Sequence, residues 1–237
     1  MKRRELLLFG AVFLASVVLA ALAALSLRQW ESTAQRHVRD QARDMATMTA
    51  EKIEMAVLKT EEEGLARLQL ALRDRPLLVD RVDAWTRENS FFARIDLFDR
   101  GGARLYPPPS EPAGPATFEQ VRSEIPPSFW DRGGRRHVRL GADVLCAAVL
   151  PDAPDEPVLA VLTRSEQGLR RDILEKTLAG LEGQSVLAVL DASDRPIYSP
   201  RPLDRAEHVV TVASGDALPA WRLALYEPAG LSPRDAV

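Results

Sequence analysis

The sequence contains a short internal repeat that restricts the folds open to it. Residues 95–106 (IDLFDRGGARLY) and 187–198 (LAVLDASDRPIY) align without a gap at an offset of 92 residues. In each copy an apolar stretch ends in Asp99 or Asp191, a short polar turn follows, and a second stretch ends in Tyr. Asp accepts hydrogen bonds from turn amides, so the pattern is typical of β-hairpins. We expect two related sheet modules, and we interpret both Asp residues as structural turn residues, not as a catalytic pair.

Further strands are predicted after each hairpin. The apolar stretches that follow the two hairpins are 136–140, 143–150 and 157–163 after the first, and 208–213 and 221–226 after the second. Between the modules, apolar residues at helical spacing predict a connecting helix over 166–183, with Ser165 as its N-cap. The fold class is therefore α+β.

A long helix is predicted over 28–75, because this stretch contains no Pro until Pro76 and Gly64 is its only Gly. Its apolar stripe is interrupted by Gln41 and Lys52, and it is too long for a small domain to cover. We therefore expect the N-terminal half of this helix to pair with that of a second copy, as a homodimer. The acidic run 61–63 is interpreted as a solvated helix face. The proposed stripe consists of Ala34, Val38, Met45, Met48, Ile53, Ala56, Leu65, Leu68 and Leu72.

The N-terminal region resembles a membrane anchor. Residues 6–27 contain no charged residue, and as a helix they would span about 33 Å, which is enough to cross a bilayer. A cleaved signal peptide is the alternative, since basic residues precede the run and Ala21-Leu22-Ala23 is similar to a cleavage site. The apolar run continues beyond that site, so we predict an uncleaved transmembrane helix. Residues 1–5 are then cytoplasmic, the anchor lies in a bacterial inner membrane, and the soluble part is periplasmic.

Composition excludes several classes of protein. The 237 residues carry a net charge of −3 at a sequence pI of about 5.7, which leaves no basic surplus for binding nucleic acid. The single cysteine, Cys146, permits no internal disulfide, and the three histidines lie far apart in the sequence, so disulfide scaffolds and zinc folds are not expected. Cys146 lies in an apolar stretch and is interpreted as a buried small hydrophobic residue. No metal ion and no cofactor are predicted.

The order of elements resembles a known family. A membrane helix that continues into a long helix, followed by two unequal modules that each open with an Asp-turn-Tyr hairpin, resembles the tandem PAS-like (double Cache) sensor regions of bacterial transmembrane receptors. The resemblance implies a first, distal module at 76–165, the connecting helix, a second, proximal module at 184–228, and the start of an exit segment at 229–237. It also implies that a ligand binds in the first module and that the parent receptor has a histidine kinase, chemoreceptor or cyclase output, of which we favour a sensor histidine kinase.

A ligand site is predicted in the first module. The stretch from Pro107 to Arg136 is long enough to form a pocket wall, whereas the second module has only nine residues in the corresponding place. Aromatic side chains can exclude water from such a pocket, and Arg can bind a carboxylate through two hydrogen bonds. The alternative is that the aromatic residues fill the core and the arginines are solvated. The candidate residues are Tyr106, Phe129, Trp130, Arg135 and Arg136.

The sequence therefore predicts a small-molecule sensor region, with a carboxylate or an amine as the ligand class. No phosphate-binding loop and no nucleophile elbow occurs in the sequence, so no catalytic residue is proposed. The alternative function is a membrane-anchored scaffold that binds proteins and senses no ligand.

Overall fold

A computed structural model describes residues 2–110, 117–140, 143–151, 156–179, 185–204 and 206–228; side chains are described from Ser16 onward, except that of Glu31. The chain divides into two compact units, Met1–Met45 and Ala46–Val237. The predicted exit segment, 229–237, lies outside the described residues, as does the end of the predicted connecting helix at 180–183.

Helix α1 is continuous from Lys2 to Leu72 and so crosses the boundary between the two units. The predicted long helix is confirmed, although it ends three residues before Arg75. A short 3₁₀ helix, η1 (Arg75–Leu77), contains Pro76 and leads into α2 (Leu78–Glu88). No helix in the described part of the chain is long and apolar enough to cross a membrane. The side chains of 6–15, which belong to the predicted span, lie outside the described residues.

The predicted apolar stripe of α1 is buried only in part in the single chain. Val38, Met45 and Met48 are exposed, with 69% of Met48 accessible. The buried face follows helical spacing along another line and includes Ala, a Gly and an acid, so counting apolar residues does not identify the face that packs on the sheets. In the second unit this face comprises Ala46, Thr49, Ala50, Ile53, Val57, Glu61, Gly64, Leu68 and Leu72.

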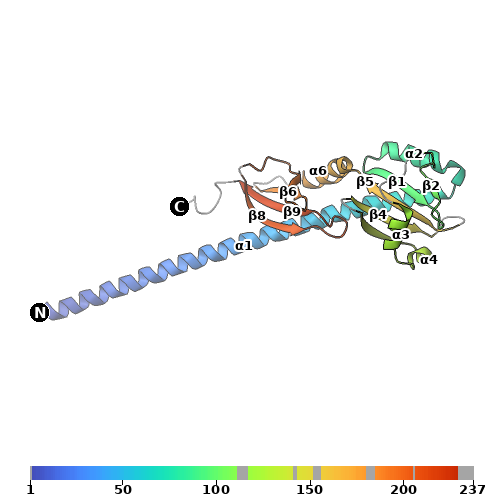
Figure 1. The fold of residues 1–237 in the computed structure, drawn as a ribbon. Helices are drawn as coiled ribbons and strands as arrows, with labels where there is room; N and C mark the ends of the chain where they lie inside the picture. Colours follow the sequence, from blue (N-terminus) through green and yellow to red (C-terminus); the bar gives the residue numbers. More distant parts are fainter. Residues whose placement is uncertain are drawn as a thin grey trace. The chain divides into compact units, whose positions relative to one another are not determined.

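The first sheet is antiparallel and has the strand order β2-β1-β5-β4-β3 (Figure 1). Two short helices, α3 (Phe118–Glu124) and α4 (Phe129–Arg132), occur between β2 and β3. Thr117 and Gln120 form a capping box that fixes the start of α3. The strands are β1 (Phe92–Phe98), β2 (Arg104–Tyr106), β3 (Gly134–Leu140), β4 (Asp143–Leu150) and β5 (Val158–Arg164).

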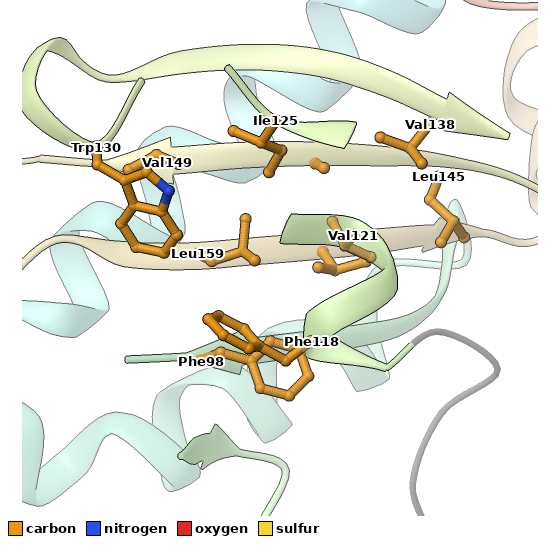
Figure 2. Close-up of a cluster of buried hydrophobic side chains, with 11 residues drawn as sticks. Phe98, Phe118, Val121, Ile125, Trp130, Val138, Leu145, Val149 and Leu159 are labelled. Carbon is orange, nitrogen blue, oxygen red and sulfur yellow. The ribbon is translucent and has the colours of Figure 1, made fainter. Parts of the chain in front are cut away.

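The α3–α4 segment covers one face of this sheet with an apolar core (Figure 2). Alternate residues of β4 and β5 enter this core, and the residues between them are buried on the opposite face. Burial on both faces explains why the two strands are continuous apolar runs. The core comprises Phe98, Phe118, Val121, Ile125, Trp130, Val138, Leu145, Ala147, Val149, Leu159 and Val161.

The second sheet is antiparallel and smaller, with the order β7-β6-β9-β8. The predicted connecting helix forms in three consecutive parts: α5 (Glu166–Gly168), the π-helical segment η2 (Leu169–Leu174) and α6 (Glu175–Leu178). The hydroxyl of Ser165 accepts a hydrogen bond from the amide of Gly168, so the predicted cap is confirmed. The strands are β6 (Val186–Leu190), β7 (Pro196–Tyr198), β8 (Ala206–Ala213) and β9 (Arg222–Pro228).

The internal repeat is confirmed in the register of the two hairpins. Leu97 pairs with Tyr106, Val189 pairs with Tyr198 at the same offset, and each ladder has an irregularity after that pair. Asp99 accepts a hydrogen bond from the amide of Ala103, and Asp191 accepts two from amides of its own turn. Both carboxylates are thus turn residues, as the sequence predicted.

Candidate functional site

Glu61 is buried, which corrects the prediction that the acidic run forms a solvated helix face. Its exposure is 0%, whereas its neighbours Glu62 and Glu63 are exposed. Glu61 lies on the buried face of α1, four residues after Val57 and seven before Leu68. A carboxylate in this position must be paired or hydrogen-bonded, because an isolated buried charge is very costly.

Two basic side chains of the first sheet form hydrogen bonds with the carboxylate of Glu61. The Nε of Arg164, in β5, donates to Oε1 at 2.9 Å, and Nε2 of His137, in β3, lies 2.9 Å from Oε2. Burial alone raises the pKa of Glu61, but the hydrogen bond to His137 and the charge of Arg164 outweigh burial and hold this pKa below its ordinary value. An ionised carboxylate only accepts hydrogen bonds, so Nε2 of His137 is the donor.

Arg164 also reaches the second module. Its Nη1 donates to the carbonyl of Ala217, in the loop between β8 and β9, at 2.6 Å. The amide of the same Ala217 donates to Oε1 of Glu54, which lies two turns before Glu61 on α1. A Cβ at Gly215 would overlap the Glu54 carboxylate, so a larger residue there would require the Glu54 side chain to shift. We call these residues, Glu54, Glu61, His137, Arg164 and Ala217, the α1 junction.

Cys146 lies beside the junction. One ligand atom from each of Glu61, His137 and Cys146 lies within 4.8 Å of the others, a spacing that could hold a metal ion. Both oxygens of Glu61 already have donors, and burial strongly raises the pKa of the Cys146 thiol. Two arginines, Arg135 and Arg164, also act electrostatically on the thiol. The surroundings therefore suit a hydrogen-bonded ion pair better than a cation, and the prediction of a buried Cys146 is confirmed.

A cleft of about 310 Å³ lies between the two modules, next to the junction. The first module contributes the start of β4, the end of β5 and the connecting helix. The second contributes the β6–β7 hairpin and the loop that leads into β9. The volume is at the lower end of the range for small-molecule sites. Its walls include Val144, Arg164, Leu169, Ile197, Leu218 and Trp221.

The predicted aromatic residues pack inside the first module. Trp130 is 9% exposed and belongs to the core under α3 and α4 (Figure 2). Phe129 is partly buried and packs against that core. Tyr106 is buried in the edge strand β2, and its hydroxyl donates to Asp83 of α2 at 2.7 Å. The structure thus brings Phe129 and Trp130 together but directs Tyr106 toward a different helix.

The two predicted arginines project from opposite faces of β3, since they are adjacent in a strand. Arg136 donates to the carbonyl of Glu124 at 2.8 Å, on the α3 side. Arg135 donates to the carbonyl of Leu58 on α1 at 3.1 Å. The five predicted residues are therefore not gathered around one cavity, and a ligand contact with any of them stays a prediction.

Sequence reasoning missed the junction because its members lie far apart in the chain. One signal was available: Glu61 interrupts a line of small and apolar residues that runs through Ile53, Val57, Gly64 and Leu68 at helical spacing. A carboxylate on such a line predicts a buried basic partner. Which basic residue is the partner depends on how the strands pair, and this cannot be read from the sequence. In the structure, β3 places His137 opposite Cys146, and β5 ends at Arg164.

No protein-family model and no curated protein matches the sequence. Among solved structures, the chain is similar to the ligand-binding domain of the amino-acid chemoreceptor PctC of Pseudomonas aeruginosa in complex with GABA (15% identity, 80% of this chain and 99% of that chain, TM-score 0.41). It is also similar to that of the Pseudomonas fluorescens chemoreceptor CtaA with L-serine (13%, 81% and 98%, TM-score 0.39). A third likeness is to the extracellular domain of a candidate histidine kinase (11%, 78% and 92%, TM-score 0.41). Likenesses at this level leave the function to be argued from the chain's own residues.

Proposed function

We propose that this chain is the extracytoplasmic small-molecule sensor region of a membrane-bound bacterial receptor. The N-terminal part of α1 crosses the inner membrane at 6–27, residues 1–5 lie in the cytoplasm, and the two sheet modules lie in the periplasm as a tandem PAS-like (double Cache) pair. The receptor is a two-component histidine kinase whose output domain is not among these residues.

The observation that carries the proposal is the α1 junction. One continuous helix is fixed to both sheets by a buried ion pair and by hydrogen bonds from Arg164 and Ala217. A change in the relation of the two modules must therefore alter the hydrogen bonds of Glu54 and Glu61. Because α1 is unbroken, a shift at these residues is passed along the helix toward its N-terminus. This coupling is what a receptor needs to transmit ligand binding.

The dimer is proposed to form through exposed apolar residues of α1. Val38, Met45, Met48 and Met55 follow a heptad-like spacing, and each is at least 45% exposed. In a parallel pair these residues would bury one another, while Gln41 and Lys52 on the same line weaken the association. Cysteines introduced as Val38→Cys should form a disulfide between protomers in membranes. Faster crosslinking at Arg39→Cys would place the contact on another face.

A ligand screen tests the sensing function. The purified full chain in detergent is exposed to small carboxylates and amines, and its thermal midpoint is measured. A ligand at 100 times its dissociation constant adds about 2.7 kcal/mol of stability, which is a large shift. At least one compound should raise the midpoint. A screen in which no compound does so contradicts the sensor and favours the scaffold.

Topology is tested separately with reporter fusions. Alkaline phosphatase fused after Val237 should be active, because it needs the oxidising periplasm, and a cytoplasmic reporter at the same position should be silent. The reverse pattern contradicts the proposed orientation.

A further inference from the structure

The methionines that follow Met1 all lie exposed on α1, and none belongs to the buried core of the described residues. They are Met45, Met48 and Met55, and their exposed fractions are 46%, 69% and 66%. Methionine ordinarily fills gaps in apolar cores, because its side chain is flexible. An exposed thioether is instead open to oxidants, which add an oxygen to the sulfur and turn an apolar side chain into a polar one.

The two most exposed methionines are each followed by a lysine at the same spacing. Lys52 comes four residues after Met48, and Lys59 comes four residues after Met55. Residues four apart on a helix are neighbours on its surface, and all four of these residues are exposed. Each thioether therefore has an ammonium group on its own side of the helix. The other lysines of the chain are Lys2 and Lys176.

An ammonium group beside a thioether suits the reaction with a peroxide. The sulfur attacks one oxygen of hydrogen peroxide, and the O–O bond breaks, so that sulfur is oxidised by two electrons and the peroxide is reduced. The leaving hydroxide takes a proton from the ammonium, and the protonated sulfoxide returns a proton to the amine. Thioether and hydrogen peroxide thus give sulfoxide and water. The ammonium can then donate a hydrogen bond to the sulfoxide oxygen.

Cys146, the one cysteine of the chain, is shielded from the same reaction. It is buried in β4, and burial strongly raises the pKa of its thiol. Oxidation of cysteine needs a thiolate and access to solvent. The sulfur chemistry open to a peroxide is therefore concentrated on α1.

We propose that Met48 and Met55 form a reversible oxidation site for peroxides and that their sulfoxides weaken the pairing of two α1 helices. This inference rests on the dimer of the proposed function and adds an oxidant response to it. Both thioethers are apolar members of the pairing line, whereas a sulfoxide oxygen is costly to bury without a hydrogen bond. Lys52 on the same line keeps the pairing weak, so the sulfur atoms meet solvent whenever the helices separate.

The site is tested by peptide mass spectrometry of the full chain in detergent, treated with hydrogen peroxide. Met48 and Met55 should gain oxygen at least threefold faster than Met45, which is followed at the same spacing by the buried Thr49. Lys52→Ala should slow the oxidation of Met48 at least twofold and leave that of Met55 unchanged. Equal rates at the three methionines, or a rate at Met48 that ignores Lys52→Ala, overturn the proposed site.

The effect on pairing is tested by sedimentation equilibrium of the same chain. Peroxide treatment should raise the dimer dissociation constant at least tenfold, and a methionine sulfoxide reductase should restore it. The double variant Met48→Leu, Met55→Leu keeps the apolar surface without thioethers; it should pair at least as tightly as the parent and should not respond to peroxide. Met45→Leu is the matched control, because it keeps both proposed sites and should respond as the parent does.

The outcomes separate this inference from the proposed function. An oxidised parent that pairs as tightly as the reduced chain overturns the inference and leaves the sensor intact, and so does a double variant that responds to peroxide as the parent does. A parent that is monomeric at every concentration before peroxide contradicts the proposed dimer and the inference with it. The ligand screen, carried out on the reduced chain, tests sensing independently.

Discussion

The two sheet modules share a hairpin and differ in what covers the sheet. The strands correspond in order, β2-β1-β5-β4 to β7-β6-β9-β8, and the first sheet adds β3 as an extra edge. Before β3 the first module inserts α3 and α4, whose side chains complete a core of eleven buried residues. On the corresponding face of the second sheet, the described buried cluster has three residues, Ala188, Leu190 and Ala224, while Leu187, Val189, Leu223 and Leu225 are buried on its other face. The longer insertion therefore serves to cover one face of the first sheet with apolar side chains.

This difference bears on where a binding cavity can lie. The sequence favoured the long insertion of the first module as the wall of a ligand pocket. In the structure, Phe118 and Trp130 of this insertion pack into the core instead. The described cleft near 310 Å³ lies instead where the second module meets the end of β5.

The largest expected effect tests the contrast in packing. Trp130→Ala should lower the free energy of unfolding by about 3 to 5 kcal/mol, because it leaves a cavity in the first core. Trp221→Ala, at a half-buried position on the second module, should cost clearly less. Guanidinium unfolding of both variants makes the comparison, and equal losses would show that the modules are equally packed.

The next effect concerns the group that joins the modules to α1. Glu61→Gln leaves the buried Arg164 without a counter-charge and should cost about 3 kcal/mol. Glu62→Gln is the matched control, and its effect should stay within about 0.5 kcal/mol, because Glu62 is exposed. If the two variants unfold at the same denaturant concentration, the junction does not stabilise the fold.

A pH series sharpens the same comparison. The pKa of Glu61 is lower in the folded chain than its ordinary value of 4.5, so this residue contributes stability that is fully present above pH 4.5. That stability is lost as the pH falls through the folded pKa. Glu61→Gln should therefore lose less stability than the parent chain between pH 4.5 and pH 2, and Glu62→Gln should follow the parent. Parallel curves for all three would contradict the paired state of Glu61.

The smallest effect compares the two copies of the hairpin. Asp99→Ala should cost about 1 kcal/mol through the lost hydrogen bond to the amide of Ala103. Asp191→Ala should lower the thermal midpoint further, since Asp191 accepts two turn amides and an Arg195 side-chain bond. A larger effect at Asp99 would show that these turn hydrogen bonds do not set the stability of the two hairpins.

Local chemistry made much of the fold predictable. The hairpins follow from Asp and the turn residues, the Ser165 cap from its hydroxyl, and strand β4 from an apolar run that matched its observed bounds, Asp143–Leu150. These signals act over a few residues, so one sequence suffices to read them.

The candidate site could not be predicted in the same way. Its partners Glu61, His137 and Arg164 are separated by 76 and 103 residues. Their meeting depends on which face of α1 is buried, and Ala46, Ala50 and Gly64 give that face a weak apolar signal. The exposed Met45 and Met48 gave a stronger signal for the opposite face.

The central claim is that ligand binding at the modules moves α1 through the junction. The direct measurement is the rate of disulfide formation between Val38→Cys protomers in membranes, with and without a saturating compound that raises the thermal midpoint in the screen; native Cys146 is buried and does not interfere. We predict that the ligand changes this rate at least threefold in the parent chain and leaves it unchanged in Glu61→Gln. An unchanged rate in a parent chain whose thermal midpoint shows that the ligand is bound would contradict the account.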